Sequence, residues 1–434
     1  MRRRDHVRSQ PAMAPHDRPA TGTPEPTQPG TGPAAPTKVI RVIARLNVGG
    51  PTRHATLLND GLRRHGFDPL LVYGSIDPTE GSLEDLVERL GLRAHRIPEL
   101  GRRISLWSDA SALWQLTRIV FRERPDIVHT HTAKAGTLGR LAALAYNITR
   151  PRRRRCVVIH TFHGHVFSGY FGPAGSYLVR LLERGLALAT DRILTISARQ
   201  QHDISVRYRI APVEKTAVIE LGLDFDDLLA LDRDARAREP FGFAPGDVVF
   251  GYVGRFAPVK NLPALVRAFG AMATRRADVR LLLVGDGEAR PALEALTASL
   301  GIAERVRFAG WRRDIDAVYG SIDVGVLSSL NEGTPVALIE AMAAARPVIA
   351  TAVGGVEDLV VHGRSGLVVP SGDEDALADA MDRLAADAGA RLTLGAAARE
   401  SVRTRFGRAR LEAEISRCYG RVLEEKRRDP PQAR

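Results

Sequence analysis

Short apolar runs rich in Val, Ile and Leu recur along the chain, and each is followed by a polar or glycine-containing turn and then by a helical pattern. In the printed sequence these runs cover residues 39–44, 70–73, 127–131, 156–160, 193–196, 248–253, 281–284, 324–327, 347–349 and 366–369. Strands that alternate with helices in this way form parallel sheets with helices on their faces. The sequence therefore predicts an α/β protein.

The series of strands and helices pauses after Gly222 and starts afresh at Val248, which indicates two domains. A chain of 434 residues is long enough for two domains that each have a core. We expect a disordered, Pro-rich tail over residues 1–37, a first domain over 38–222 and a second over 223–408, followed by a last helix at 409–425 and a short tail at 426–434.

The composition favours a protein of the cytoplasm. The chain is 44% hydrophobic and 26% charged, as soluble globular proteins are. No stretch approaches the run of about 20 apolar residues that crosses a bilayer, and the charged start has no apolar segment behind it, as a secretory signal would have. Two cysteines, Cys156 and Cys418, agree with a reducing compartment.

The net charge of +12 is concentrated in the first folded half of the chain. Residues 38–222 hold 28 Lys and Arg against 16 Asp and Glu, whereas residues 223–434 are almost neutral. Five of these basic residues fall within residues 150–155. A basic domain beside a neutral one favours an anionic partner, either a membrane surface or a nucleic acid. The alternative is an Arg-rich composition without any partner.

Two carboxylates, Glu332 and Glu340, stand on either side of a predicted helix start. Glu332 lies in a turn with Gly333 and Thr334 after the strand at 324–327, and a helix follows from Pro335. Open α/β sheets bind ligands at the carboxyl ends of their strands, where free N–H groups of a helix start favour phosphate. Glu340 is surrounded by apolar residues and needs a hydrogen-bond partner, which is either a ribose diol or a nearby Arg.

A second polar loop follows the strand at 248–253. It contains Gly254, Arg255 and Lys260. A paired Arg and Lys at the carboxyl end of a strand can hold a diphosphate, although surface charge is the alternative explanation. The later turn at 285–287 lacks the full dinucleotide fingerprint, so a dehydrogenase is disfavoured.

The first half offers its own polar turns. Gly49 and Gly50 precede a helix and permit a close approach of backbone to a phosphate or sugar. His129 and His131 alternate onto one side of a strand that ends near Lys134, but no third ligand follows at metal spacing, so we expect no metal.

His163 stands first in a glycine-, histidine- and aromatic-rich loop after the strand at 156–160. Its place at the carboxyl end of that strand directs it to the same crevice, where it could donate to a ligand oxygen. The alternative is a structural histidine.

Several of these motifs together resemble glycosyltransferase family 4. The motifs are Glu332 and Glu340 with seven residues between them, Gly254-Arg255 followed by Lys260-Asn261, the Val-Gly-Asp-Gly run at 284–287, and Pro347-Val348-Ile349-Ala350 before Gly354-Gly355. The resemblance spans residues 38–425. It implies the GT-B fold, with two Rossmann-like domains facing across a cleft and a last helix that crosses back to the first domain. It also implies a retaining transferase that uses a nucleotide-sugar and no metal.

The resemblance assigns roles to the donor-side residues. Arg255 and Lys260 would hold the donor diphosphate and stabilise its charge as it leaves, and Glu340 would hold the ribose hydroxyls. Glu332 and the backbone of Gly333 would contact the hydroxyls of the donor sugar. Gly254 belongs to the diphosphate loop, and Thr334 and Pro335 belong to the sugar loop. Thr334 stands where many members have Phe or another bulky residue, which leaves the preferred sugar open.

The resemblance also assigns the residues of the first domain. His163 matches a histidine near the donor sugar, so the catalytic set is His163, Arg255, Lys260 and Glu332. Gly49 and Gly50 match the N-terminal glycine loop, and with His131 and Lys134 they would line the acceptor side of the cleft.

The polar loops of the first domain look most like the subset that builds bacterial polysaccharides and glycans on polyprenyl-diphosphate lipids, often from UDP-N-acetylhexosamines. We therefore expect a UDP-sugar donor, a lipid-linked or oligosaccharide acceptor, and attachment of the basic domain to the anionic cytoplasmic face of the membrane. A sugar-nucleotide epimerase of the same fold and a non-catalytic scaffold are the alternatives. A nucleic-acid partner is disfavoured because no recognition motif supports it.

Overall fold

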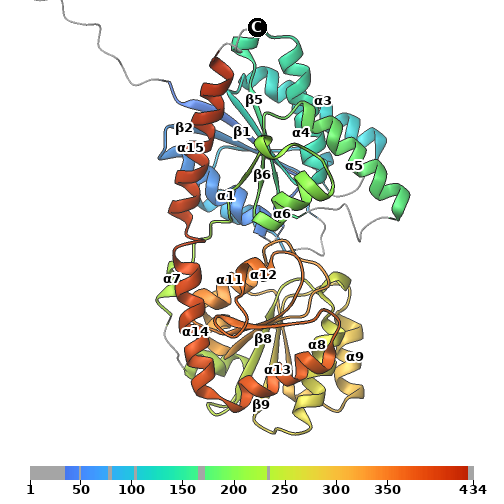
Figure 1. Ribbon diagram of the computed structural model, residues 1–434, viewed down its shortest axis with the longest axis vertical. Coiled ribbons are helices and arrows are strands. Elements are labelled where there is room, and N and C mark those ends of the chain that lie inside the picture. Colours follow the sequence, from blue (N-terminus) through green and yellow to red (C-terminus); the bar gives the residue numbers. More distant parts are fainter. Residues whose placement is uncertain are drawn as a thin grey trace, which may run out of the picture. The chain divides into compact units, whose positions relative to one another are not determined.

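The computed structural model describes residues 35–47, 50–76, 81–101, 105–164, 172–231 and 235–428. The described residues from Pro36 onward belong to one compact unit with two parallel sheets (Figure 1). We call each sheet with its helices a lobe. Residues 1–34 of the expected first tail and residues 429–434 of the expected last tail lie outside the described residues, and Thr37, placed in the tail from the sequence, is the first residue of β1.

The first lobe has a seven-stranded sheet in the order β3-β2-β1-β4-β5-β6-β7, and every described pairing in it is parallel. Its strands are β1 Thr37–Ile43, β2 Phe67–Tyr73, β3 Ala94–Arg96, β4 Ile127–His131, β5 Val157–Phe162, β6 Arg192–Thr195 and β7 Thr216–Val218. Its helices are α1 Gly50–Arg63, α2 Glu84–Arg89, α3 Leu106–Glu123, α4 Ala133–Ile148, α5 Pro173–Leu188 and α6 Ala198–His202.

The second lobe has a six-stranded parallel sheet in the order β10-β9-β8-β11-β12-β13. Its strands are β8 Val248–Val253, β9 Val279–Val284, β10 Val306–Gly310, β11 Val324–Leu327, β12 Val348–Thr351 and β13 Gly366–Val369. Its helices are α7 Asp226–Leu229, α8 Leu262–Ala273, α9 Arg290–Ser299, α10 Ile315–Ser321, α11 Val336–Ala343, α12 Val356–Leu359, α13 Glu374–Ala386 and α14 Ala388–Arg403.

The strands are buried on both faces, as parallel sheets covered by helices require. All five residues of β4 and all six of β5 are buried. The central strands therefore read as continuous apolar runs, which is why the sequence pattern located them.

The last helix, α15 Arg408–Arg427, leaves the second lobe and packs on the first, as the resemblance implied. Its apolar residues Leu411, Ile415 and Tyr419 join one buried cluster with Val39 of β1 and Leu58 of α1. Figure 1 shows α15 along the first lobe, whereas α14 lies on the second. The final helix thus ties the two lobes together.

Each sheet reverses its strand order once, between β1 and β4 and between β8 and β11. Ligands of open α/β sheets bind at the carboxyl ends of strands beside such a reversal. The loop before α1 and the loop before α8 follow β1 and β8 directly, so both lie at this position. Among the described residues, no helix is long and apolar enough to cross a bilayer.

Candidate active site

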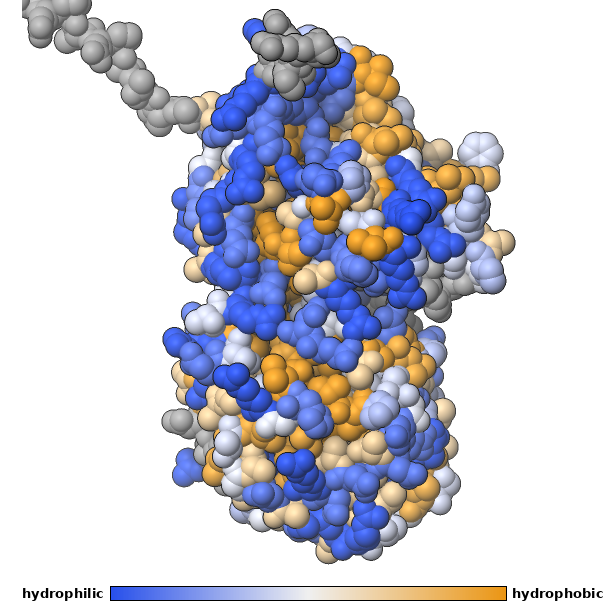
Figure 2. All heavy atoms as spheres, viewed as in Figure 1, coloured by the Kyte–Doolittle hydropathy of each residue, from blue (hydrophilic) through white to orange (hydrophobic). Residues whose placement is uncertain are grey.

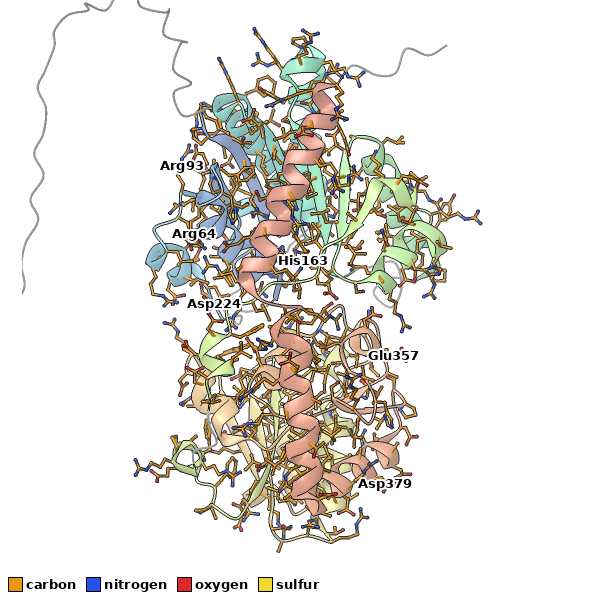
Figure 3. The ribbon with its side chains drawn as sticks, turned by 60° about the vertical axis from the view of Figure 1, so that its left-hand side comes forward. Arg64, Arg93, His163, Asp224, Glu357 and Asp379 are labelled. Carbon is orange, nitrogen blue, oxygen red and sulfur yellow. The ribbon has the colours of Figure 1, made fainter. Side chains whose placement is uncertain are left out.

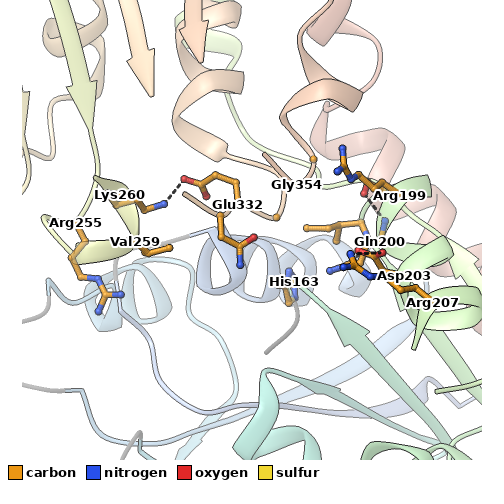
Figure 4. Close-up of a pocket in the computed structure, with 16 residues that line it drawn as sticks. His163, Arg199, Gln200, Asp203, Arg207, Arg255, Val259, Lys260, Glu332 and Gly354 are labelled. Atoms are coloured by element: carbon orange, nitrogen blue, oxygen red, sulfur yellow. Dashed lines mark hydrogen bonds and ion pairs between the residues drawn. The ribbon is translucent and has the colours of Figure 1, made fainter. Parts of the chain in front are cut away.

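Two cavities of about 350 and 360 Å³ lie where the lobes meet. They share a wall of six residues, which are His163, Ile196, Arg255, Lys260, Glu332 and Gly333. We call the one that contains Arg199 and Asn331 the first cavity (Figure 4) and the one that contains Trp311 and Glu340 the second cavity. The shared wall brings together all four residues that the resemblance named as catalytic.

The second cavity combines an apolar part with the predicted donor residues. The apolar part is formed by Val253, Val284, Trp311, Ile315 and Leu327, which come from β8, β9, β11 and the region after β10. The polar residues that line the same cavity are Arg53, Gly254, Arg255, Lys260, Glu332, Gly333, Thr334 and Glu340, and Pro335 lies beside them. A flat apolar base and a polar ribose diphosphate could occupy such a cavity together.

Glu332 is held on the wall by two short hydrogen bonds. Its Oε1 accepts from Lys260 Nζ at 2.6 Å and from the Ser329 hydroxyl at 2.6 Å. The ion pair brings the loop after β8 and the loop after β11 together, and Figure 4 shows it at the edge of the first cavity. The positive charge of Lys260 is therefore balanced by Glu332.

Glu340 is only 6% exposed although it belongs to the predominantly apolar helix α11. The Tyr319 hydroxyl donates to Glu340 Oε2 at 2.9 Å, and the Arg53 guanidinium of α1 donates to Glu340 Oε1. Burial and the negative charge of Glu340 raise the pKa of Tyr319, so the phenol keeps the proton that it donates. Both partners that the sequence analysis considered for Glu340 remain relevant, because Arg53 occupies one oxygen and the carboxylate still borders the cavity.

Two glycines allow the backbone of the lobes to approach closely. A Cβ on Gly333 would lie 2.6 Å from the carbonyl oxygen of His163, and a Cβ on Gly50 would lie 2.8 Å from Cγ2 of Val336. Both distances are too short for any other residue type. Gly50 begins α1, and Pro335 is the residue before α11 rather than its first residue. These contacts set the walls on either side of the second cavity.

Among the predicted site residues of the first lobe that the structure describes, His163 and Gly50 line a cavity. His131 is fully buried, and its Nδ1 lies 2.9 Å from His163 Nε2, so it reaches the cavity wall only through His163. Lys134 instead bonds the Glu99 carbonyl and Asp109 at 2.9 and 2.6 Å and lines neither cavity. Gly49 lies outside the described residues.

Several cavity residues had no motif in the sequence. The first cavity is lined by Ser197, Arg199, Gln200, Asp203 and Arg207 from α6 and the turn after it. Ser197 was recognisable as a helix cap, and its hydroxyl accepts from the Gln200 N–H. No sequence motif marked Tyr319 or Arg53 as a site residue, because each contacts Glu340 from a distant part of the chain.

Three imidazoles, those of His54, His131 and His163, place nitrogen atoms within 4.8 Å of one another. His54 is the third imidazole, and it was not expected from the sequence because it is distant from the other two along the chain. The surroundings oppose a cation, since the Arg41 guanidinium lies 3.1 Å from His131 Nε2. Two of the three rings already face each other through a hydrogen bond.

Comparison with known proteins agrees with this geometry. Residues 48–227 match the model "Glycosyltransferase Family 4", and residues 247–387 match "Glycosyl transferases group 1". An Escherichia coli UDP-Gal:alpha-D-GlcNAc-diphosphoundecaprenol alpha-1,3-galactosyltransferase is 30% identical over 74% of this chain and 81% of its own length. The Staphylococcus aureus capsular polysaccharide glycosyltransferase CapM is 29% identical over 76% of this chain and 86% of its own.

Solved structures share the fold at low sequence identity. HepE from Anabaena in complex with UDP superposes with a TM-score of 0.73, at 20% identity, over 89% of this chain and all of that one. Sucrose-phosphate synthase from Thermosynechococcus elongatus has a TM-score of 0.75 at 21% identity, over 90% of this chain and all of that one. Together with the matches to the two family models, these relationships show that the chain belongs to glycosyltransferase family 4 and is a GT-B glycosyltransferase.

Proposed function

We propose that the protein is a retaining glycosyltransferase that moves a hexose or N-acetylhexosamine from UDP to a lipid-linked or polysaccharide-precursor acceptor. The name of the Escherichia coli relative includes a UDP-sugar and a diphosphoundecaprenol lipid, and the Staphylococcus aureus relative acts in capsule synthesis. HepE was solved with UDP and with UDP-glucose. These names support the substrate class, and the lining of the second cavity supports the position that we assign to the donor.

The observation that carries the proposal is that one cavity, the second, is lined both by apolar side chains and by the predicted donor-binding residues. The apolar part beside Trp311 accepts the base, and Glu340 accepts the ribose hydroxyls. Arg255 and Lys260 then meet the diphosphate, while Glu332 and Gly333 meet the sugar. The lining of this one cavity thus offers a partner for each part of a nucleotide-sugar.

The chemistry assigned to these groups requires no metal. Negative charge develops on the diphosphate as the sugar leaves, and two cations fixed beside it stabilise that charge. Lys260 is paired with Glu332, so a diphosphate would compete with this carboxylate for the ammonium group. In a retaining transfer on the leaving-group face, a diphosphate oxygen takes the proton of the acceptor hydroxyl.

The first cavity is the proposed acceptor side. Arg199, Gln200, Asp203, Arg207 and Asn331 are polar residues of its lining, and His163 lines both cavities. A polar wall with two Arg residues suits an acceptor that carries hydroxyls and a diphosphate. In the present proposal, the acceptor contacts expected of His131 and Lys134 are made instead by these residues of α6 and of the helical turn Asp203–Arg207.

The proposed membrane contact is the outer surface of α3, α4 and α5. Large apolar side chains stand exposed on all three helices, including Trp107 at 90%, Ile148 at 71% and Leu178 at 66%. Figure 2 shows apolar side chains gathered at the edge of the first lobe where these helices lie. Arg180 on α5 and the exposed Arg residues at 152–154 supply positive charge nearby. Apolar side chains interleaved with Arg suit the surface of an anionic membrane.

The experiment that tests the proposed function is calorimetric binding of UDP, GDP and ADP with and without magnesium. We expect UDP to bind without magnesium and the other two nucleotides to bind more weakly. Transfer from a panel of UDP-sugars to a lipid-diphosphate acceptor then identifies the sugar, and the anomeric configuration of the product tests retention. Absence of nucleotide binding, or turnover of the donor to an epimer without acceptor, would contradict the proposal.

A further inference from the structure

Arg41 of β1 is fully buried and holds four neutral groups around it. Its Nε donates to Asn59 Oδ1 at 2.6 Å and its Nη2 donates to the Tyr419 hydroxyl at 3.0 Å. Its Nη1 lies 3.2 Å from His129 Nδ1 and 3.1 Å from His131 Nε2. A guanidinium has only donors, so each of these four atoms must accept a hydrogen bond.

This requirement fixes the proton on His131. Burial and the positive charges around it lower the pKa of His131 well below its usual range, so the ring is neutral and carries one proton. Because Nε2 accepts from Arg41, the proton is on Nδ1. The opposite arrangement would place two N–H donors against each other at 3.1 Å in a buried site.

The proton on His131 then fixes the proton on His163. His131 Nδ1 lies 2.9 Å from His163 Nε2, so this nitrogen of His163 must accept the hydrogen bond. Burial lowers the pKa of His163 to about 3, so His163 is also neutral and keeps its proton on Nδ1. The proton positions on His131 and His163 are thus set in turn by Arg41, whose guanidinium can donate hydrogen bonds but cannot accept them.

The Nδ1–H of His163 has no hydrogen-bond partner among the residues that the structure describes. His163 lines both cavities, and in Figure 3 it lies at the edge of the first lobe that faces the second. Buried polar groups without a partner are rare in folded proteins and need an explanation. An oxygen atom of a bound substrate would supply the missing acceptor.

We infer that Arg41 and His131 hold His163 in the one tautomer that presents Nδ1–H as a hydrogen-bond donor to a substrate oxygen, which excludes His163 as the general base of the reaction. The nitrogen of His163 that could take a proton is already occupied by His131. Arg41 and His131 are positioning residues, because they act on the substrate only through His163. The tautomer follows from the described contacts alone, whereas its effect on sugar transfer rests on the proposed function.

The last helix holds the start of this relay. The Tyr419 hydroxyl of α15 accepts from Arg41 and lies 2.6 Å from His129 Nδ1, so Tyr419 and Arg41 share the single lone pair of that nitrogen as donors. His129 therefore carries its proton on Nε2, which lies 2.7 Å from the Thr161 hydroxyl. The helix that crosses between the lobes thus fixes the guanidinium on which the orientation of His163 depends.

The first test reads the tautomers directly from the protein without ligand. In protein labelled with ¹⁵N-histidine, two-bond nitrogen–proton correlations distinguish Nδ1–H from Nε2–H for each ring. We expect His163 and His131 to carry the proton on Nδ1 from pH 6 to 8, with His129 carrying it on Nε2. A His163 signal with the proton on Nε2, or one that titrates in this range, would overturn the inference. Zinc binding that shifts the His131 and His163 signals together would also overturn it, because their facing nitrogens would then be ligands.

The second test uses sugar transfer and two amides of different reach. The amide nitrogen of Asn stands where Nδ1 stands in His, whereas that of Gln stands nearer Nε2. We expect His163→Ala and His163→Gln to lower kcat by about 100-fold, as loss of a preorganised donor does, and His163→Asn to recover at least about tenfold of that loss. Equal losses for Ala and Asn would indicate a proton acceptor and overturn the inference.

The same comparison at His131 separates positioning from packing. His131→Asn keeps a donor toward His163 Nε2, whereas His131→Leu has similar bulk and no donor. We expect the Leu variant alone to lose kcat while both variants bind UDP normally. His160→Asn is the control, since His160 is equally buried on β5 but contacts Thr130 and lies off the relay. If no variant of the protein binds UDP or transfers sugar, the proposed function fails while the tautomer measurement still decides the relay.

Discussion

Arg53 at the start of α1 donates to the Oε1 atom of Glu340, although the two residues belong to different lobes. Glu340 Oε2 is held by Tyr319, which is fixed in the same lobe. One oxygen of the carboxylate is thus held permanently, and the other is held by a side chain that is 29% exposed. A ribose that reaches Glu340 would approach the oxygen held by Arg53, so we expect the ion pair and ligand binding to compete.

The first prediction concerns Glu340→Ala. Hydrogen bonds from a ligand to a charged group contribute about 1.5–3 kcal/mol, so UDP affinity should fall by about 10- to 150-fold. The fold should persist because the Tyr319 hydroxyl, freed from Glu340, can donate to the Ala337 carbonyl, whose oxygen lies 3.0 Å away. Calorimetry with UDP measures the loss. Glu374→Ala is the control, because Glu374 also pairs with an Arg but lies on α13 and lines neither cavity. Unchanged affinity in Glu340→Ala would remove Glu340 from the donor site.

The second prediction concerns Arg53→Met, which removes the competing cation and keeps its apolar stem. Partly exposed ion pairs contribute up to about 1 kcal/mol, so UDP affinity should rise by up to about fivefold. The same titrations as for Glu340→Ala measure the change. A weaker affinity in Arg53→Met would show that Arg53 contacts the nucleotide itself rather than competing with it.

The sequence predicted the fold because the signals that determine it are local. Buried parallel strands such as β4 and β11 are short apolar runs, and turns at their ends are marked by glycine and polar residues. The crossing helix was predicted only through the family resemblance. Its amphipathic pattern alone does not tell which lobe it covers, and the contact of Tyr419 with Arg41 spans 378 residues of sequence.

The site was predictable where a motif occupies one loop. The sequence placed Arg255, Lys260 and Glu332 at strand ends and Glu340 in the helix that follows, and the fold brings all four to one cavity. The roles of these residues in binding and catalysis stay predictions. The sequence did not reveal why Arg41 is buried, because four of its partners come from α1, β4 and α15.

The third prediction concerns the loss of stability in mild acid. Four histidines of the first lobe are buried and His163 is half-buried, and loss of solvation lowers the pKa of all five below the usual value of 6.5: His54, His129, His131, His160 and His163. Below pH 6.5 the unfolded chain takes up protons that the folded chain cannot. Stability should therefore be full above pH 6.5 and fall as the pH drops, and for His163 the fall continues toward about pH 3.

Each buried histidine adds about 1.4 kcal/mol of lost stability per pH unit once the pH is well below 6.5. Melting temperatures measured between pH 7.5 and 5 should fall steeply, and His160→Asn should make the fall shallower. His202→Gln, at an exposed position, is the control and should leave the slope unchanged. A melting temperature independent of pH in this range would contradict the buried, neutral histidines.

The fourth prediction concerns the ion pair between Arg140 of α4 and Glu183 of α5. Arg140 Nη2 donates to both oxygens of Glu183 at 2.9 and 2.8 Å, and both residues are buried. Glu183→Gln leaves the guanidinium without a counter-charge and should cost about 3–5 kcal/mol of stability. Glu374→Gln breaks the exposed pair with Arg267 and should cost at most about 1 kcal/mol. Denaturant unfolding of both variants gives the comparison, and equal costs would contradict the role of burial.

The fifth prediction concerns the exposed apolar surface of α5. Leu178 and Leu182 are four residues apart on this helix and are 66% and 48% exposed. If this surface enters the lipid interface, replacing both with Glu removes apolar contact and adds repulsion from anionic headgroups. Binding to vesicles that contain anionic lipid should fall by at least about tenfold, and wild-type binding should weaken as salt is raised.

A matched variant tests whether the effect belongs to this surface. Leu392→Glu changes a leucine of α14 that is 56% exposed on the second lobe, and it should bind vesicles as the wild type does. With a water-soluble acceptor, the α5 variant should retain the wild-type rate because neither leucine lines a cavity. With the acceptor embedded in vesicles its rate should fall together with its binding. Equal vesicle binding by the α5 variant and the wild type would place any membrane contact on another part of the chain.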